Sequence, residues 1–156
     1  MLAILLLSIV GCSQEDIKLS PQIEQEGEEI SVRFTVNIPD YKTVQTRANG
    51  GVNDLYLLVF DQNGSMIARR QATLSNQTDQ GGSFTASLPS SASPRVVHFI
   101  SNYDWASFND QLNVGVNEAA VVALMSTSNA TFWTREVLSN GISTTTFNGQ
   151  TVELLR

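Results

Sequence analysis

Residues 30–38 read ISVRFTVNI, and this stretch decides the class of fold that we expect. Its apolar side chains occupy every even position, and its polar side chains occupy every odd one. A period of two places all the apolar side chains on one face of an extended strand. We therefore expect a half-buried strand that turns its even-numbered side chains into a core and ends at Pro39.

Two other runs are apolar with little alternation, LYLLVF at 55–60 and VVHFI at 96–100. Continuous apolar runs of this length are typical of central strands that are covered on both faces. Asn63-Gly64 follows the first run, and an extended pattern resumes over 65–74. Asn-Gly in this position predicts a tight hairpin with positive φ at both turn residues.

The other segments are short and are bounded by turn residues. Alternation predicts a strand over 83–88, while the polar segments 40–53 and 75–82 are expected to be loops. Asn-Gly pairs at 140–141 and 148–149 predict two more hairpin turns. The strands that these turns separate are expected at 134–138, 142–147 and 151–155.

One segment has the pattern of a helix. Asn117 is a favourable N-cap for residues 118–125, where Val121, Leu124 and Met125 share a face. About seven short strands with turns between them, together with this one short helix, favour an all-β sandwich over βαβ units.

Composition limits the class of protein. The 156 residues suggest one domain, and Ser, Thr, Asn and Gln make up a third of them, with only two lysines. This polar, weakly charged composition favours an extracytoplasmic β domain over a helical cytosolic enzyme. The net charge of −6 argues against a nucleic-acid partner, because phosphate binding needs a basic face.

The N-terminal run MLAILLLSIV is too short to span a bilayer but suits the core of a signal peptide. Ser8-Ile9-Val10-Gly11 then leads into the sole cysteine, Cys12. This order resembles a bacterial lipobox, in which a cysteine after a small residue is lipidated. The alternative is a buried N-terminal strand with an inert cysteine, and no basic residue precedes the run, unlike in most signal peptides.

Acidic residues are concentrated directly after this cysteine. Residues 15–29 carry six carboxylates and one lysine, which is typical of a solvated tether. Ser13-Gln14-Glu15-Asp16 also resembles the acidic surface-export signal of Bacteroidetes lipoproteins. We expect a signal peptide over 1–11, an acidic tether over 12–27 and a β-sandwich domain over 28–156.

One cysteine and one histidine leave little material for catalysis, for a disulfide or for a zinc site. His98 has no Ser, Cys or acid at a motif spacing, so we interpret it as structural rather than as a catalytic base. The segment DQNG at 61–64 resembles half of a calcium loop, but the hairpin interpretation is favoured because the later bidentate glutamate is missing. We expect no enzymatic activity, metal or cofactor.

Aromatic residues offer one candidate ligand site. Tyr103, Trp105 and Phe108 follow the run at 96–100, and Trp133 lies further along the chain. An exposed row of such rings, built from Tyr103, Trp105 or Trp133, would form a platform on which a sugar stacks. The alternative is that these rings plug one end of the sandwich.

Several motifs follow one another in a particular order. After the lipobox and the alternating strand come Thr46-Arg47-Ala48, VNDLYLLVFD at 52–61 and VHFISN at 97–102. Phe132-Trp133 and VELLR at 152–156 follow. This order resembles the N-terminal domain of the Bacteroidetes fimbrillin-like lipoproteins, which include the stalk, anchor and accessory subunits of type V pili.

The resemblance implies a transthyretin-like Greek-key β-sandwich without catalysis, lipid-anchored in the outer membrane and exposed at the cell surface. The implied partners are other fimbrial subunits, joined by strand exchange, and a ligand on a host or bacterial surface. The family usually has a second β domain after a segment like 154–156, so a fragment, a truncated product and a minimal subunit are all open alternatives. The competing function is a glycan-binding surface lipoprotein of a polysaccharide uptake system.

The resemblance also implies a processing site. In the fimbrillins an arginine-specific protease removes the first strand and opens a groove for a neighbour's strand, whereas anchor subunits keep that strand. Thr46-Arg47-Ala48 lies where such a cut would fall, which predicts cleavage after Arg47 and a new N-terminus at Ala48. The alternative is that Arg47 is an ordinary exposed loop residue.

Overall fold

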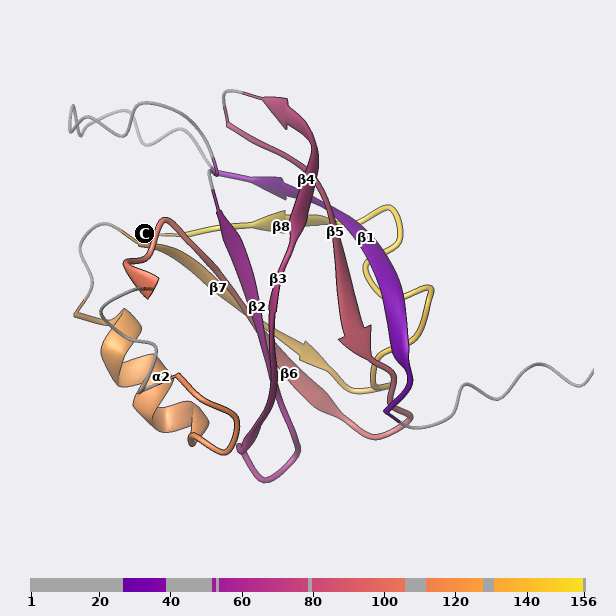
Figure 1. Ribbon diagram of the computed structural model, residues 1–156, viewed down its shortest axis with the longest axis vertical. Helices are drawn as coiled ribbons and strands as arrows, with labels where there is room; N and C mark the ends of the chain where they lie inside the picture. Colours follow the sequence, from indigo (N-terminus) through magenta and orange to yellow (C-terminus); the bar gives the residue numbers. More distant parts are fainter. Residues whose placement is uncertain are drawn as a thin grey trace, which may run out of the picture.

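A computed structural model describes residues 27–38, 52, 54–78, 80–105, 112–127 and 131–155. The chain forms two four-stranded sheets that face each other, with one helix on the outside (Figure 1). The expected all-β sandwich with one short helix is confirmed, with eight strands where about seven were expected.

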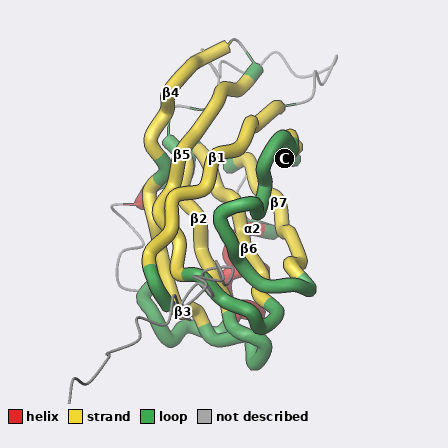
Figure 2. The backbone as a smooth tube through the Cα atoms, turned by 90° about the vertical axis from the view of Figure 1, so that its right-hand side faces the viewer, coloured by secondary structure: helices red, strands yellow, loops and turns green. Residues whose placement is uncertain are grey.

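The first sheet has the strand order β4-β5-β1-β8. Its members are β1 (Glu29–Asn37), β4 (Thr73–Thr78), β5 (Gly81–Pro89) and β8 (Thr151–Glu153). All neighbours run antiparallel except β1 and β8, which are parallel. β1 is therefore an internal strand of this sheet, and the tube drawing shows β4, β5 and β1 side by side (Figure 2).

The second sheet has the strand order β3-β2-β6-β7 and is antiparallel throughout. Its members are β2 (Leu55–Phe60), β3 (Met66–Gln71), β6 (Arg95–Ser101) and β7 (Phe132–Leu138). Only Ala72 separates β3 from β4, so one extended stretch of chain forms an edge strand of both sheets in turn.

The inner core lies between the two sheets. The predicted alternation of β1 is confirmed, because Ile30, Val32, Phe34 and Val36 are all buried there. The Phe34 ring lies among three other phenylalanine rings at centroid distances of 5.3 to 6.2 Å. These partners are Phe84, Phe99 and Phe147.

An outer core covers the opposite face of the second sheet. Leu58, Phe60 and Ile100 point to this side and pack against helix α2 (Glu118–Met125) through Val121 and Met125. The predicted burial of β2 and β6 on both faces is therefore confirmed, and the helix supplies the second cover (Figure 1).

The predicted helix over 118–125 is confirmed, including its cap. The Asn117 side chain accepts a hydrogen bond from the backbone N–H of Ala119 at 2.9 Å. The Glu118 backbone N–H donates to the carbonyl of Gly64, which ties the start of the helix to the β2–β3 hairpin.

The loop predicted over residues 75–82 is wrong, because β4 and the start of β5 form a hairpin there. Gly81 and Gly82 begin β5 where two other strands approach closely. A Cβ on Gly81 would lie 1.9 Å from the Val36 carbonyl oxygen, and one on Gly82 would lie 2.4 Å from that of Asn76. The glycines that suggested a loop are needed for close strand packing.

The strand predicted over 142–147 and the hairpin at 148–149 are also wrong. Residues 144–149 form turns, and only Ile142 makes an isolated bridge, to Ser91. The turns carry the chain from β7 in the second sheet to β8 in the first. Phe147 adopts a φ of 64°, a rare value for a bulky residue, and its buried ring fills the inner core.

The Asn63-Gly64 hairpin between β2 and β3 is confirmed, but its predicted turn geometry is wrong. Gly64 has a φ of 76°, whereas Asn63 is not among the residues with positive φ. The Asp61 side chain instead accepts hydrogen bonds from the backbone N–H groups of Asn63 and Ser65, both at 2.9 Å.

Candidate functional site

Three of the residues singled out from the sequence, at the two expected modification sites, lie outside the described residues. These are the expected lipidation site, Cys12, and the expected processing site, Arg47 and Ala48. The structure does describe the strand that the processing would release, so the candidate site is built around β1.

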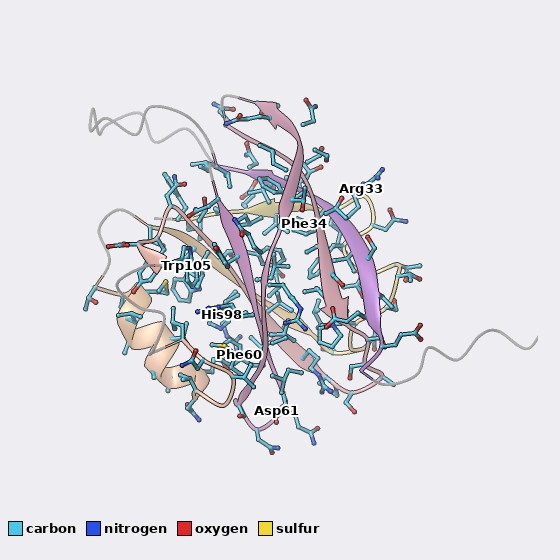
Figure 3. All side chains as sticks on the ribbon, in the orientation of Figure 1. Arg33, Phe34, Phe60, Asp61, His98 and Trp105 are labelled. Atoms are coloured by element: carbon cyan, nitrogen blue, oxygen red, sulfur yellow. The ribbon has the colours of Figure 1, made fainter. Side chains whose placement is uncertain are left out.

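β1 lies in a slot between β5 and β8. Nine consecutive residue pairs join it to β5, from Glu29 opposite Pro89 to Asn37 opposite Gly81. β8 pairs with only three of its residues, 35–37. Figure 3 shows Phe34 pointing between the sheets and the neighbouring Arg33 pointing away from them.

Loop residues continue the wall of the slot where β8 stops. The Thr35 N–H donates to the Gln150 carbonyl at 3.2 Å, and the Phe147 ring contacts Phe34. On one side, β1 thus pairs with β5 in a long regular ladder. On the other side, it meets the short strand β8 and the turns that precede β8 in the chain. The side chains that fill the slot are Ile30, Val32, Phe34 and Val36.

An ion pair lies on the outer face of the first sheet, at the beginning of β1. The Arg70 guanidinium of β3 pairs with the Glu29 carboxylate, which also accepts a hydrogen bond from the Ser87 hydroxyl at 2.8 Å. The hydrogen bond from Arg70 lowers the pKa of Glu29 below its usual value. Both side chains are more than a third exposed, so water screens the pair and its contribution is small.

The aromatic residues do not form an open row. Tyr103 is only 7 % exposed, and burial raises its pKa to about 12. Its ring meets that of Trp105 edge-on at 5.1 Å, while the Tyr56 ring lies 4.1 Å from Trp105 on centroids. Trp133 is half-buried and packs with His98 instead.

The alternative position predicted for these rings, at one end of the sandwich, is wrong. They do not plug an end of the sandwich, because Tyr103, Trp105 and Trp133 belong to the outer core on the face of the second sheet. Phe108 lies outside the described residues.

His98 is the centre of a polar network inside this outer core. Its Nε2 lies 2.9 Å from Glu118 Oε1, and Trp133 Nε1 donates to its Nδ1 at 3.0 Å. Because Trp Nε1 can only donate, Nδ1 is the acceptor and the proton of the neutral ring is on Nε2. Arg135 Nε donates to the same Glu118 oxygen at 2.6 Å, so strands β6 and β7 both hold the first turn of α2.

Burial keeps the His98 ring neutral. Burial lowers its pKa below the usual 6.5, although the Glu118 carboxylate acts in the opposite direction. A second ring proton would sit on Nδ1, facing the N–H of Trp133. The hydrogen bond from Arg135 lowers the pKa of Glu118, which therefore stays ionised. Both nitrogens of His98 are occupied, which is the arrangement of a structural histidine.

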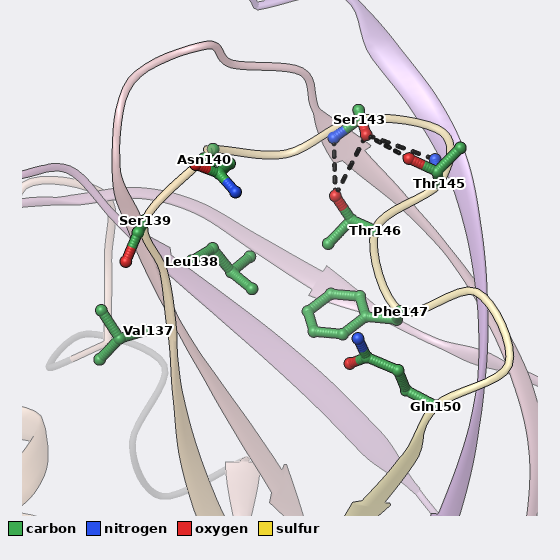
Figure 4. A pocket seen from close by; sticks show the side chains of 10 residues that line it. Val137, Leu138, Ser139, Asn140, Ser143, Thr145, Thr146, Phe147 and Gln150 are labelled. Atoms are coloured by element: carbon green, nitrogen blue, oxygen red, sulfur yellow. Dashed lines mark hydrogen bonds between the residues drawn. The ribbon is translucent and has the colours of Figure 1, made fainter.

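A hollow with a volume of about 400 Å³ lies on the described part of the chain (Figure 4). It lies between the end of β7 and the turns before β8, and no charged side chain lines it. Its hydroxyls already bond one another, since Ser143 Oγ lies 3.0 Å from Thr145 Oγ1 and the Ser143 N–H donates to Thr146 Oγ1 at 2.8 Å. The lining of the hollow is mostly polar and carries no charge.

Sequence reasoning missed the partners of His98. Glu118 and Arg135 lie 20 and 37 residues from it, and only the packing of α2 on the second sheet brings them together. The available signal was the combination of Glu118 in the first turn of the predicted helix and His98 as a lone polar residue in an apolar strand.

A scan against protein-family models, a search of curated proteins and a search of solved structures found no match. In the part of the chain that the structure describes, no helix is long and apolar enough to cross a membrane.

Proposed function

We propose that this protein is a fimbrial subunit or fimbrial anchor lipoprotein of the outer membrane that acts through protein–protein contacts. In this proposal Cys12 carries the lipid, the acidic segment 12–27 is the tether, and the sandwich presents β1 as an exchangeable strand. The proposed role needs no catalytic residue and no cofactor. It includes adhesion, with other fimbrial subunits as partners.

The observation that carries the proposal is the way in which β1 fills its slot. One continuous strand supplies four core side chains, and the 17 residues between Asn37 and Leu55 join it to β2. If β1 left, the slot would expose backbone groups of β5 and β8 together with an apolar floor. Such a slot accepts another strand of the same pattern, since main-chain hydrogen bonds give affinity and alternate pockets give specificity.

The geometry of the rings weighs against the glycan-binding alternative. A sugar platform needs ring faces open to water, whereas Tyr103 is buried and meets Trp105 edge-on. Trp133 is engaged with His98 through its Nε1 hydrogen bond.

Intact-mass measurement of the protein from its native outer membrane tests the proposal. A chain that begins at acylated Cys12 is the result expected for an anchor, and a chain that begins at Ala48 is the result expected for a processed subunit. Two or more acyl chains hold a protein stably on a membrane, so the Cys12→Ser variant should leave the membrane fraction.

Arg47→Gln is the matched control for processing and should retain the full chain from Cys12. Recovery of a chain that carries no acyl group and still begins upstream of Cys12 would contradict the proposal. Equal membrane retention of Cys12→Ser would contradict the anchor.

A further inference from the structure

The two sheets present four edge strands, and these differ in length and charge. In the part of the chain that the structure describes, β4 and β8 flank the first sheet, and β3 and β7 flank the second. Free strand edges are templates for pairing with another chain, and proteins usually protect them with charge, proline or brevity. The four edges differ in how well they are protected.

Three of the edges carry such protection. β8 has only three residues. β3 carries Arg69 and Arg70 in succession, so two copies would bring like charges together. β7 carries Arg135 and Glu136, and Leu155 already bonds both backbone groups of its Trp133.

β4 has no charge and no proline in its sequence TLSNQT. All of its side chains are exposed except Leu74, which is half-buried. The ribbon and the tube both show the β4–β5 hairpin projecting beyond the other strands (Figures 1 and 2). This edge is therefore the one that offers its backbone groups without a charge to keep a neighbour away.

A bulge at Ser75 divides β4 and determines which part can pair. The register with β5 shifts between Leu74 and Asn76, and the Ser75 hydroxyl donates to the Ser83 carbonyl at 2.9 Å. Residues 76–78 continue as a regular ladder on β5, with Gln77 opposite Gly82. The regular part of the free edge is thus centred on Gln77.

We propose that β4 is a self-association edge, where a second copy of this chain pairs antiparallel about a two-fold axis at Gln77. The axis places Gln77 opposite Gln77, and Asn76 opposite Thr78. Each of these side chains carries both donors and acceptors, so identical surfaces satisfy each other. The two first sheets become one continuous sheet, and β1 stays in its slot, so this contact is separate from strand exchange.

The contact is short, so the dimer is weak and depends on concentration. Sedimentation of the full chain in mild detergent, over a concentration series, should show a monomer–dimer equilibrium. Gln77→Lys and Gln77→Glu should each weaken the dimer by about tenfold or more, because like charges then lie directly opposite on the axis. An equimolar mixture of the two variants should restore dimers, since the opposite charges pair.

Gln62→Lys is the matched control, because it places the same charge on an exposed glutamine in the β2–β3 turn of the second sheet and should leave dimerisation unchanged. A wild-type chain that stays monomeric throughout the series would overturn the proposal. So would a mixture of the two Gln77 variants that dimerises no better than either variant alone, or a Gln62→Lys chain that loses its dimer equally.

Discussion

At the scale of single residues, His98 connects three elements through one neutral ring. It accepts from Trp133 on β7 and donates to Glu118 at the start of α2, while its own side chain is 0 % exposed. A buried polar group stabilises a fold only when its partners are present, and here both nitrogens have one. Removal of either partner would leave a buried polar atom without a bond, at a cost of about 1–3 kcal/mol.

The state of His98 predicts how stability depends on pH. Its pKa is lower in the folded chain than the 6.5 of an unfolded one, so the unfolded chain takes up the proton first as the pH falls. The free energy of unfolding should therefore be constant above about pH 7, fall below about 6.5 and stop falling at the folded pKa. The lowered pKa of Glu118 adds a second loss, which begins only near its usual 4.5.

Urea unfolding between pH 8 and 4 measures this dependence. His98→Gln retains a donor toward Glu118 and an acceptor toward Trp133 without an ionisable ring, and the chain has no other histidine. This variant should lose the fall that begins near pH 6.5. An unchanged fall in His98→Gln would mean that other groups cause it.

At the scale of elements, burial decides which strands the sequence reveals. β1 could be predicted because Ile30 to Val36 alternate into the inner core, and β2 because both of its faces are covered. β4 could not be predicted, since an edge strand that is exposed on most of its surface has the composition of a loop. The strand predicted over 142–147 was wrong because it was placed between two Asn-Gly pairs, whereas the tertiary packing of Phe147 decides the backbone there.

The alternation of β1 predicts opposite effects for neighbouring residues. Phe34→Ala removes a buried ring that contacts three others and should cost about 3–5 kcal/mol of unfolding free energy. Thr35→Ala changes an exposed side chain on the same strand and should cost about 0.5 kcal/mol or less. Similar losses in the two variants, measured by denaturant unfolding, would mean that β1 does not face the core in this register.

At the scale of the whole molecule, the sandwich has an inner core and an outer core on either side of the second sheet. The sequence indicated the number of strands and the covered faces of β2 and β6, but not which strands pair. It grouped Tyr103 and Trp105 along the chain, but it did not indicate that Trp133 joins them in the outer core beside α2. Pairings such as β1 with β8 join residues more than a hundred positions apart, and local patterns carry no information on them.

The strand-exchange part of the proposed function depends on one property of this architecture, the replaceability of β1. Cleavage of the folded full chain with an arginine-specific protease, with cuts located by mass spectrometry, should separate β1 covalently after Arg47. We expect the cleaved chain to stay folded while β1 occupies its slot. A fluorescent peptide of residues 28–38 can then report on exchange.

Uptake of this peptide in mild denaturant is the most direct measurement. The cleaved chain should release its own β1 and bind the labelled peptide, while the uncleaved Arg47→Gln chain and a peptide with Val32→Asp and Phe34→Asp should give no uptake, because the slot is apolar. A cleaved chain that stays folded, keeps its original strand and excludes the matching peptide would contradict the account.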